Sequence, residues 1–598
     1  MLKLLQVLQN GERGAAMLRV IHTLRGKQFF VRSLNSFALL SMMLFLSGGG
    51  ATFGQTNPPP RIFFTDLDSG PNTGGENVGG SAGAYVTLYG TNLGVTQGTS
   101  TVTWNGSSCL RVVSWGTAHL WYQQIVVQLG PSCAVGTGNF IVSTSAGVSN
   151  GIPFTVRSGH IYFVTTTGSD SAAGTFAAPW KTPVKAKNTM VAGDITYIRS
   201  GTYGGIENDS AIVWLPGHEG TSGNNLALVG YPGELPILDA GQSQGYAIRC
   251  NYSSCRYWTI ANLSMPNATD RGVYWEESPS DGVRLIANVI YNTNHENVVF
   301  EGSLTGHKIY GNEMYNPDHI GPTDKGYSIY YGAYGIQDGI DFGWNSLHFD
   351  LAGSYESKGM QFYGHVNGDR IRNVVIHDNM LANYCMEGIV MGGTDAPDGQ
   401  GPFENTNTEY LYNNVFIHNG FCDPNYGYSA VKFATGNYKL YNNTFYFNGN
   451  SPRVSPSGDI DNQGVTSMEV TNNIFFAPSP NPNYCGYICY EYSGSSSQMS
   501  GTDNLFFNFG NGPSWATNSI NGHDPLFVNP TLSISTANFN VQPASPVIGA
   551  GLHALTSVTD IAGNLRPNPP SLGAFELSSL SSVVRPNPPT NLQVTAVQ

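Results

Sequence analysis

The densest group of side chains suited to acid–base chemistry in this 598-residue chain lies in residues 358–370. Lys358, Tyr363, His365 and Arg370 are residue types that accept protons, donate protons or neutralise anions. Elimination next to a carboxylate needs a cation to neutralise the carboxylate, a base to take the adjacent proton and an acid to protonate the leaving oxygen. We therefore predict that Lys358, His365, Arg370 and Tyr363 are catalytic.

Acidic side chains precede and interleave this group. Asp338, Asp341, Asp350 and Glu356 could supply the oxygen ligands that Ca²⁺ prefers. We predict these four residues as ligands of a Ca²⁺ cofactor that helps to hold an acidic substrate. A turn capped by aspartate explains the spacing of Asp338 and Asp341 equally well, so the sequence is compatible with both interpretations.

The charge balance restricts the partners of the chain. Lys and Arg number 27 and Asp and Glu number 40, for a net charge of −13; six basic residues and one acidic residue precede residue 51, so the remainder has 21 against 39, or −18. Such a chain repels nucleic acid and anionic membranes and admits a polyanion only beside local cations or a bound metal. Charged residues make up 11% of the chain, against about 25% in an ordinary soluble domain, which excludes a coiled coil or a charge-rich disordered chain.

The N-terminus has the pattern of an export signal. Basic residues lead into the apolar run Phe37–Leu46, and the small-residue tract Ser47–Ala51 follows. The run is about half as long as the ~20 residues of a membrane-spanning helix, and small residues after such a run are what signal peptidase requires. We predict a signal peptide over residues 1–51, bacterial-type export to the medium or cell surface, and no membrane span in the mature chain.

Export makes the cysteines informative. The eight cysteines fall as sequence neighbours: Cys109 and Cys133, Cys250 and Cys255, Cys385 and Cys422, Cys485 and Cys489. In an oxidising compartment this pattern is typical of local disulfides that hold loops. Zinc binding is a weaker interpretation, because no CxxC pair stands beside an HxxxH, and the sequence leaves the pairing open.

Residues 58–157 predict a β-sandwich. Short alternating strands such as Tyr85–Gly94 and Gln124–Leu129 are separated by Gly, Asn and Ser turns, as in immunoglobulin-like folds. Together with Trp121 and Ser149–Phe154, the segment Val86–Gly94 resembles the IPT/TIG immunoglobulin-like family. That resemblance implies a spacer or binding role and no chemistry.

From residue 160 onward the chain repeats. Asparagine followed by apolar residues recurs every 24 to 35 residues, at Asn262, Asn288, Asn312, Asn345, Asn379, Asn414, Asn443, Asn473 and Asn504. A period between about twenty and fifty residues is typical of a solenoid, and strand-type residues between Gly and Asn turns exclude the helical kinds. We therefore predict a parallel β-helix whose corner asparagines tolerate a left-handed backbone and hydrogen-bond their copies in neighbouring coils.

Both ends of this region resemble a known superfamily. Residues 178–203 resemble the opening segment, and residues 524–576 the closing segment, of bacterial pectate-lyase-like right-handed β-helix proteins. The resemblance implies an all-β chain with a right-handed parallel β-helix over residues 160–577 after the sandwich. It implies no single reaction, because this fold hosts lyases, hydrolases, epimerases, esterases and adhesins. Residues 578–598 are typical of a linker and the start of a truncated fibronectin III-like module.

Aligning one strand of each coil predicts a binding face. The columns that begin with Val273 and Trp275 are uniformly apolar and must point inward, so the alternate columns point outward. The outward residues mix rings, amides and charges along the axis, as an extended sugar chain requires. We predict substrate binding by Glu276, Glu301, Tyr274, Tyr330, Gln361 and Lys432. The coils from Asn312 to Asn414 are the longest, so their loops could wall a groove beside this face.

Three functions fit these features. A secreted lyase would cleave a uronic-acid polysaccharide by β-elimination, and the resemblance to β-helix lyases, several of which use Lys or Arg and calcium, favours it. A glycoside hydrolase would use paired carboxylates about 5–9.5 Å apart, either Glu276 with Glu301 or Asp338 with Asp341. A non-catalytic glycan-binding or adhesin-type protein would use the face for attachment alone. We predict the lyase, acting as a monomer on a polysaccharide.

Overall fold

The computed structural model of the chain describes residues 58–319, 326–351, 356–421, 428–449, 458–477, 488–489, 498–508 and 512–577. The described chain is all-β apart from short helical turns and the helix α3 (Pro183–Thr189). Thr182 caps this helix: its hydroxyl accepts a hydrogen bond from the Lys185 amide at 3.1 Å, and Pro183 supplies the fixed backbone of the first turn. The predicted signal peptide and the predicted C-terminal module lie outside the described residues.

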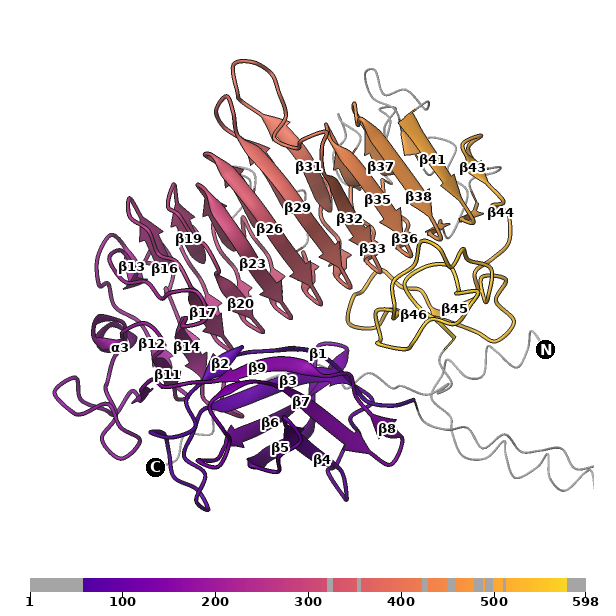
Figure 1. The fold of residues 1–598 in the computed structure, drawn as a ribbon. Coiled ribbons are helices and arrows are strands. Elements are labelled where there is room, and N and C mark those ends of the chain that lie inside the picture. The colour runs from indigo at the N-terminus through magenta and orange to yellow at the C-terminus, as the bar shows by residue number, and fades with distance from the viewer. Residues whose placement is uncertain are drawn as a thin grey trace, which may run out of the picture. The chain divides into compact units, whose positions relative to one another are not determined.

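Two small sheets make up the N-terminal part (Figure 1). The first has the order β1 (Arg61–Thr65), β3 (Tyr85–Thr91), β6 (Tyr122–Leu129) and β5 (Leu110–His119), all antiparallel. The second has the order β2 (Ser69–Gly70), β9 (Ile152–Val156), β7 (Gly136–Thr144) and β4 (Thr101–Trp104), with β8 (Gly147–Val148) beside β7. Their inward residues, among them Val86, Trp104 and Phe140, share one buried cluster. The two sheets agree with a sandwich, while its IPT/TIG membership stays a prediction.

From residue 161 onward the chain winds through three parallel sheets, confirming the predicted solenoid (Figure 1). Sheet A contains β10 (Ile161–Val164), β11 (Ile195–Ile198), β14 (Leu226–Gly230), β17 (Trp258–Ala261), β20 (Arg284–Ile286), β23 (Leu304–Tyr310), β26 (Ile336–Gly343), β29 (Arg370–His377), β32 (Thr408–Tyr412), β35 (Asn437–Tyr441), β38 (Ser467–Thr471), β41 (Met499–Thr502) and β43 (Ala516–Thr517). Sheet B contains β12 (Thr202–Tyr203), β15 (Ile237–Leu238), β18 (Ser264–Pro266), β21 (Val289–Tyr291), β24 (Glu313–Tyr315), β27 (Ser346–His348), β30 (Met380–Ala382), β33 (Val415–Ile417), β36 (Thr444–Tyr446), β39 (Ile474–Phe476), β42 (Leu505–Phe507) and β44 (Ile520–Asn521). Sheet C contains β13 (Ala211–Trp214), β16 (Tyr246–Asn251), β19 (Val273–Glu276), β22 (Val298–Glu301), β25 (Gly326–Ala333), β28 (Ser357–Gly364), β31 (Ile389–Thr394), β34 (Ser429–Phe433), β37 (Gly458–Asn462) and β40 (Ile488–Cys489).

Each coil therefore passes from a strand of sheet A to one of sheet B and then to one of sheet C. Alternate residues of every strand point inward and stack into one apolar core, which includes Trp258, Trp275, Phe300 and Tyr331. The outward residues alternate with them, so the three sheets present three separate outer faces.

A ladder of buried asparagines stands at the corner between sheets A and B. Its members are Asn288, Asn312, Asn345, Asn379, Asn414, Asn443, Asn473 and Asn504, all fully buried. In all members but the last, Asn504, the side-chain amide donates to the Oδ1 of the next asparagine at 2.9–3.2 Å, and that Oδ1 also accepts from the backbone N–H of the preceding one. The predicted corner role is thus confirmed for these eight residues.

The ladder corrects two details of the sequence interpretation. The left-handed backbone belongs to the residue before each ladder position, such as Asp378, Asn413 or Asn442. Asn262 occupies this preceding position (φ 58°), so Leu263 stands where the ladder would begin. The Asn262 side chain bonds to the sandwich instead, donating to Asp66 at 3.1 Å and accepting from the Tyr89 hydroxyl.

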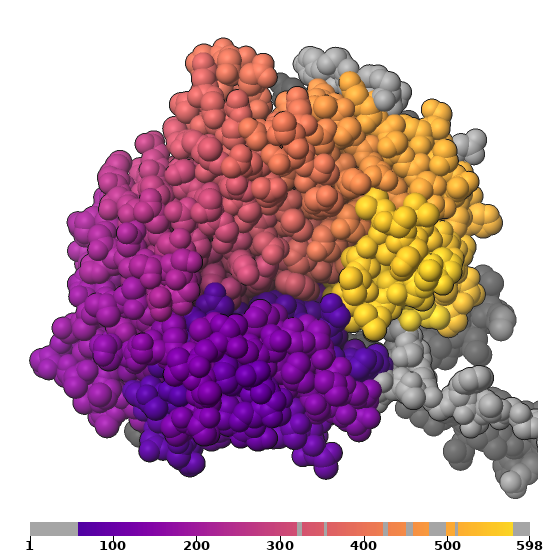
Figure 2. All heavy atoms as spheres, in the orientation of Figure 1, coloured from indigo at the N-terminus to yellow at the C-terminus, as the bar shows by residue number. Residues whose placement is uncertain are grey.

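Two outer faces of the coils are covered. The sandwich packs on sheet A at its first coils, where Ile195, Tyr197 and Val229 join the buried cluster of the sandwich. The C-terminal segment, with β45 (Phe527–Asn529) and β46 (Asn538–Val541), packs on sheet B at its later coils. The space-filling view shows the indigo sandwich directly against the coils and near the yellow C-terminal segment (Figure 2). The Trp121 indole of the sandwich donates a hydrogen bond to the Ile561 carbonyl of that segment at 3.3 Å.

Two of the predicted disulfides are formed, Cys109–Cys133 and Cys250–Cys255. Cys385 is also disulfide-bonded. Its predicted partner Cys422 and the side chains of Cys485 and Cys489 lie outside the described residues, so their pairing stays a prediction. In the part of the chain that the structure describes, no helix is long and apolar enough to cross a membrane.

The ladder predicts a strong effect of single substitutions on stability. In Asn379→Ala the bonds to Asn414 (2.9 Å) and the Phe342 carbonyl (3.1 Å) are lost and the Asn345 amide loses its acceptor. Because each unsatisfied buried group costs about 1–3 kcal/mol, we expect the free energy of unfolding in urea to fall by roughly 3 kcal/mol or more. The control Asn367→Ala removes an exposed side chain that accepts one bond from the Asp398 amide, and it should change the value by at most about 0.5 kcal/mol. Equal losses for both variants would contradict a structural role of the ladder.

Candidate active site

A groove of about 650 Å³ lies on the outer face of sheet C. Successive strands from β22 to β34 contribute to its floor, and residues before and after the strands form its walls. We call it the sheet C groove; its lining residues are Arg271, Glu296, Val299, Glu301, Tyr327, Tyr330, Lys358, Gln361, Tyr363, His365, Val390, Gly392, Gly393, Asp395, Lys432, Ala434 and Gln463.

The floor follows the predicted outward columns. The strand register pairs Val299 with Tyr330, Tyr330 with Gln361, Gln361 with Val390 and Val390 with Lys432. The predicted alignment of the coils is therefore confirmed, and it brings four predicted binding residues into the groove: Glu301, Tyr330, Gln361 and Lys432. Three predicted catalytic residues also line it: Lys358, Tyr363 and His365.

Cations are spread along the groove. The Lys358 ammonium lies 3.3 Å from the Gln361 amide oxygen and 3.4 Å from the buried Glu387 carboxylate, and 5.7 Å from the centre of the Tyr327 ring. Arg271 at one end pairs with Glu296 at 2.8 Å. With Lys432 on β34, these cations line a groove that crosses several coils of a chain with a net charge of −13.

The carboxylates of the groove are engaged by neighbouring groups. Glu301 accepts a hydrogen bond from the Tyr274 hydroxyl at 2.7 Å, and burial raises the pKa of its carboxyl despite that bond. Asp395 accepts from the Tyr363 hydroxyl at 2.6 Å. Glu296 pairs with Arg271 and Glu387 with Lys358, so the carboxylates near the groove already have partners.

Three rings stand together beside these cations. The ring centres of Tyr363 and His365 are 5.3 Å apart, and those of Tyr330 and His365 are 6.2 Å apart. The Tyr330 hydroxyl lies 3.0 Å from Nε2 of His365. Burial lowers the pKa of His365, whereas burial and then the bond to Asp395 raise the pKa of Tyr363 to about 12. At neutral pH the imidazole is therefore a free base and the phenol keeps its proton.

A short loop after β28 positions His365. The buried Asp369 carboxylate accepts the backbone N–H groups of His365 and Val366, each at 2.7 Å, and also that of Gly335 at 2.7 Å. The ring of Tyr334 stacks on the imidazole with 4.4 Å between ring centres. His365 is thus fixed by backbone bonds on one side and by a parallel ring on the other.

Gly332 provides the space that these rings occupy. A Cβ at this position would lie 2.7 Å from Cε1 of Tyr330, 2.8 Å from Nε2 of His365 and 3.1 Å from Cγ of Glu301. Contacts under 3.0 Å force a displacement, so a side chain at residue 332 would separate Tyr330 from His365. The outward column that contains Gly332 was predicted, but nothing in the sequence explains why this position is a glycine.

The structure does not bring every predicted residue to the groove. Arg370 begins β29 of sheet A, where its Nε lies 3.2 Å from Glu404. Glu276 forms an ion pair with Arg249. Tyr274 is buried, and its hydroxyl donates a hydrogen bond to Glu301. Arg370, Glu276 and Tyr274 are absent from the described lining.

The predicted calcium ligands are also separated. Asp338 on β26 pairs with Arg372 at 2.9 Å, Asp341 with His377 at 2.9 Å and Asp350 with His348 at 2.9 Å, while Glu356 is exposed. Among the described residues no group of three or more His, Cys, Asp or Glu side chains could hold a metal ion. These four residues therefore do not fit a shared Ca²⁺ site, because Asp338 and Asp341 already pair with basic side chains of sheet A and Asp350 pairs with His348 of sheet B.

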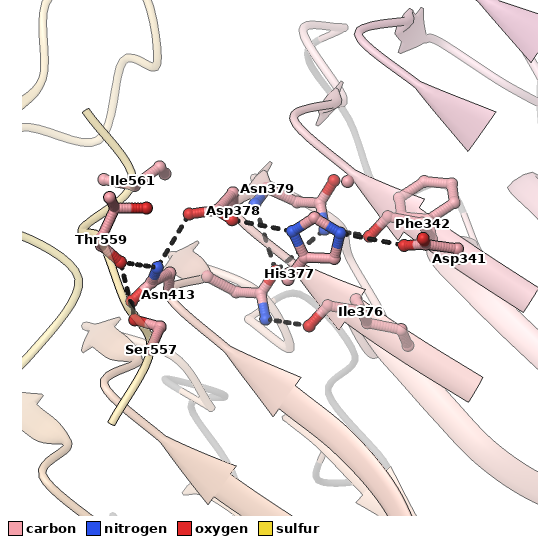
Figure 3. A network of polar contacts seen from close by, with 12 residues as sticks. Asp341, Phe342, Ile376, His377, Asp378, Asn379, Asn413, Ser557, Thr559 and Ile561 are labelled. Carbon is pink, nitrogen blue, oxygen red and sulfur yellow. Dashed lines mark hydrogen bonds and ion pairs between the residues drawn. The ribbon is translucent and has the colours of Figure 1, made fainter. Parts of the chain in front are cut away.

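Asp341 belongs to a polar network at the corner of sheets A and B (Figure 3). His377 lies between two carboxylates, with Nε2 2.9 Å from Asp341 and Nδ1 2.7 Å from Asp378. Asn413 donates to Asp378 at 2.9 Å and to the Thr559 carbonyl at 2.8 Å, which joins the network to the C-terminal segment. Burial alone would lower the pKa of His377, but hydrogen bonds to both carboxylates outweigh it and raise this pKa to about 9.

Some groove residues were not singled out from the sequence. Asp395 follows a register shift between β28 and β31. The alternation of inward and outward residues, on which the alignment of coils relied, therefore does not extend to it. Arg271 and Glu296 precede their strands, and Tyr327 is the second residue of β25, paired in register with Lys358. The row was visible in the alignment of coils, but nothing in the sequence shows that it lines the same groove as the strand residues.

The family comparison agrees with the β-helix fold. A family profile described as the Pel9A-like, right handed beta helix region matches residues 162–380, and no curated protein matches the chain. Similar solved structures include the pectate lyase Pel9A, with 16% identity over 70% of this chain and 96% of that chain at a TM-score of 0.46. Others are XylC in complex with xylose (10% identity, 70% and 98% covered, TM-score 0.40) and an alginate lyase from Paenibacillus sp. str. FPU-7 (16%, 52% and 93%, TM-score 0.29). The reaction that this chain catalyses therefore has to be inferred from the side chains of its own groove.

The His377 network predicts how stability depends on pH. A raised histidine pKa adds stability that is complete below the unfolded value of about 6.5 and is lost as pH rises through about 9. We expect the free energy of unfolding of the wild type to exceed that of His377→Gln by about 3 kcal/mol more at pH 6 than at pH 10. Urea unfolding at both pH values measures this difference, and subtraction removes the titration of groups that both proteins share. The exposed His523, changed to Gln, serves as the control, and a pH-independent difference for His377→Gln would contradict the charged network.

Proposed function

We propose that this protein is a secreted polysaccharide lyase that cleaves a uronic-acid polysaccharide by β-elimination in the sheet C groove. The observation that carries the proposal is the shared groove itself, where Lys358 and Lys432 stand beside a neutral His365 and a protonated Tyr363. These are the cation, base and acid that elimination next to a carboxylate requires. The disulfides agree with the oxidising environment that a secreted protein meets.

Substrate binding follows from the charges. Lys358, with Arg271 and Lys432 along the groove, would pair with uronate carboxylates of a chain that lies across the coils. Neutralising the carboxylate at the cleaved residue makes the adjacent C5 proton easier to remove, because the negative charge that develops is held by the ammonium group. Gln361 beside Lys358 offers an amide to sugar hydroxyls.

Proton transfer follows from the rings. The C5 proton must be accepted on the His365 side of the groove, since the neutral imidazole is a base at neutral pH. The leaving O4 must receive a proton, and Tyr363 holds one at neutral pH because its pKa is about 12. At rest the Tyr363 hydroxyl donates this proton to Asp395 at 2.6 Å, so the phenol has to leave that bond to protonate O4.

The proposal needs no step through Ca²⁺, since the predicted ligands do not fit a common site. The hydrolase alternative would use Glu276 and Glu301 as its first pair of carboxylates. Glu276 is bonded to Arg249, and of the two only Glu301 lines the groove. Its second pair, Asp338 and Asp341, is bonded to Arg372 and His377 in sheet A. We therefore favour elimination over hydrolysis.

The first test of the proposal is product chemistry. Wild-type protein is incubated without added metal on polygalacturonate, alginate, glycosaminoglycans and a neutral xylan. We expect at least one polyuronate to give a rise in ultraviolet absorbance from the C4–C5 double bond, and the neutral polymer to give none. New reducing ends without that absorbance would show hydrolysis, and binding without either product would show a glycan-binding protein.

The second test concerns the carboxylate-binding cation. In Lys358→Met we expect kcat/KM on the active polyuronate to fall by roughly 10²-fold or more, because the charge that develops next to the carboxylate loses its partner. Glu387 would be left without the 3.4 Å contact, so Lys358→Met combined with Glu387→Gln repeats the test without a buried unpaired carboxylate. Lys439→Met breaks the comparable ion pair with Glu469 in sheet A (3.1 Å) and should leave kcat/KM unchanged. Full activity of both Lys358 variants would show that the carboxylate binds elsewhere.

A further inference from the structure

The hydrogen bond between Tyr330 and His365 determines how the imidazole can act as a base. The Tyr330 hydroxyl and Nε2 of His365 lie 3.0 Å apart. Burial raises the pKa of the Tyr330 phenol, so the phenol keeps its proton, and it donates that proton to Nε2 when the imidazole proton is on Nδ1. In this Nδ1–H tautomer, which the relay requires, the single basic lone pair of the imidazole is on Nε2 and is occupied by Tyr330. In this arrangement His365 has no lone pair left to take a proton directly from a substrate.

From this geometry we propose that Tyr330 is the group that removes the C5 proton, and that His365 receives the phenolic proton behind it. The inference rests on the proposed lyase function and changes the role of Tyr330 from a binding residue to a catalytic one. Tyr330 lines the groove on β25, paired in register with Gln361 and one strand away from Lys358. The ring of Tyr327 links Tyr330 to Lys358: its centre lies 5.4 Å from the Tyr330 ring and 5.7 Å from the Lys358 ammonium.

The step balances without an additional reactant. The C5 proton moves to the phenolic oxygen of Tyr330 while the phenolic proton moves to Nε2 of His365. The electron pair of the C5–H bond forms the C4–C5 double bond, the C4–O4 bond breaks, and O4 takes the proton of Tyr363. The products are an unsaturated uronate end, a new O4 hydroxyl, an imidazolium and a tyrosinate, and water then removes the proton from the imidazolium and returns one to Tyr363.

The surroundings of the pair support a relay. Tyr334 stacks on the imidazole and Tyr363 meets its edge. The carboxylates of Asp395, Asp369 and Glu277 favour the imidazolium electrostatically, although burial outweighs them and lowers the pKa of the resting imidazole. The pair therefore starts neutral, and nearby negative charges stabilise the imidazolium that forms during the reaction.

Glycine at residue 332 is a requirement of the relay. A Cβ there would meet both Tyr330 and Nε2 of His365 at under 3.0 Å, so any other residue would break the contact through which the proton passes. The matching position in the next coil holds Tyr363, the proposed acid. Acid and base thus stand one coil apart, about 4.8 Å along the axis, with 6.5 Å between their ring centres.

The test uses the full-length protein and Tyr330→Phe, which keeps the ring and removes only the hydroxyl. We expect kcat to fall by roughly 10²-fold or more with little change in KM. The control is Tyr315→Phe, a half-buried tyrosine in the stacked row of sheet B, which should retain wild-type activity. Wild-type kcat/KM should decrease at low pH as His365 becomes protonated, and the residual activity of Tyr330→Phe should lack this decrease.

Two further measurements separate a relay from a packing role. Free imidazole should restore activity to His365→Ala in proportion to its concentration and should not restore Tyr330→Phe. In the ¹⁵N spectrum of histidine-labelled wild-type protein, Nε2 of His365 should be unprotonated at neutral pH, and its pKa should rise in Tyr330→Phe, because the donor that stabilises the neutral ring is gone.

The outcomes distinguish the relay from the lyase function. If the wild type yields unsaturated product and Tyr330→Phe remains fully active, the relay is wrong while the lyase function stands. A proton on Nε2 of the resting enzyme also overturns the relay, whatever the activity. If the wild type yields no unsaturated product on any polyuronate, the proposed function fails, and the catalytic role of Tyr330 fails with it.

Discussion

The buried asparagine ladder is the constraint on which the solenoid depends. Each amide donates to the Oδ1 of the copy in the next coil, and that Oδ1 also accepts the backbone N–H of the donating asparagine. Because an unsatisfied amide in this dry position would cost about 1–3 kcal/mol, the stacking of coils is fixed there. Coil lengths nevertheless vary from 24 to 35 residues along the ladder. The additional residues of the longer coils therefore form loops away from the ladder corner. In the longest coils these loops carry His365 and Asp395 into the sheet C groove.

A fixed register also explains why chemistry gathers on sheet C. The sandwich covers the outer face of sheet A at the first coils, and the C-terminal segment covers sheet B at the later ones. On sheet C the outward columns carry Tyr330, Gln361 and Lys432 in one row, and Glu301, Gly332 and Tyr363 in the next. Residues that are thirty positions apart in the sequence thereby become neighbours about 4.8 Å apart. A groove across several coils is the natural consequence.

The same geometry explains what the sequence could and could not predict. The columns could be predicted because strand side chains alternate with a period of two, and a slip by one residue would bury the polar row. The four predicted calcium ligands lie apart because nearness in sequence was taken as nearness in space. Within one coil the chain turns through three sheets, so Asp338 and Arg370 face outward from sheet A while Lys358 faces outward from sheet C. Asn262 was misplaced because the left-handed corner before the ladder also favours asparagine, as at Asn413 and Asn442.

The acidic composition of the chain and an acidic substrate are reconciled by local pairing. Carboxylates near the groove are held by partners: Glu296 by Arg271, Glu387 by Lys358 and Asp395 by the Tyr363 hydroxyl. Glu301 is shifted toward its neutral form by burial. A polyuronate that approaches sheet C therefore meets the ammonium groups of Lys358 and Lys432. The more distant carboxylates of the chain are screened by salt. Since charges farther than a Debye length of about 8 Å contribute little at physiological salt, these lysines govern binding more than the net charge of −13 does.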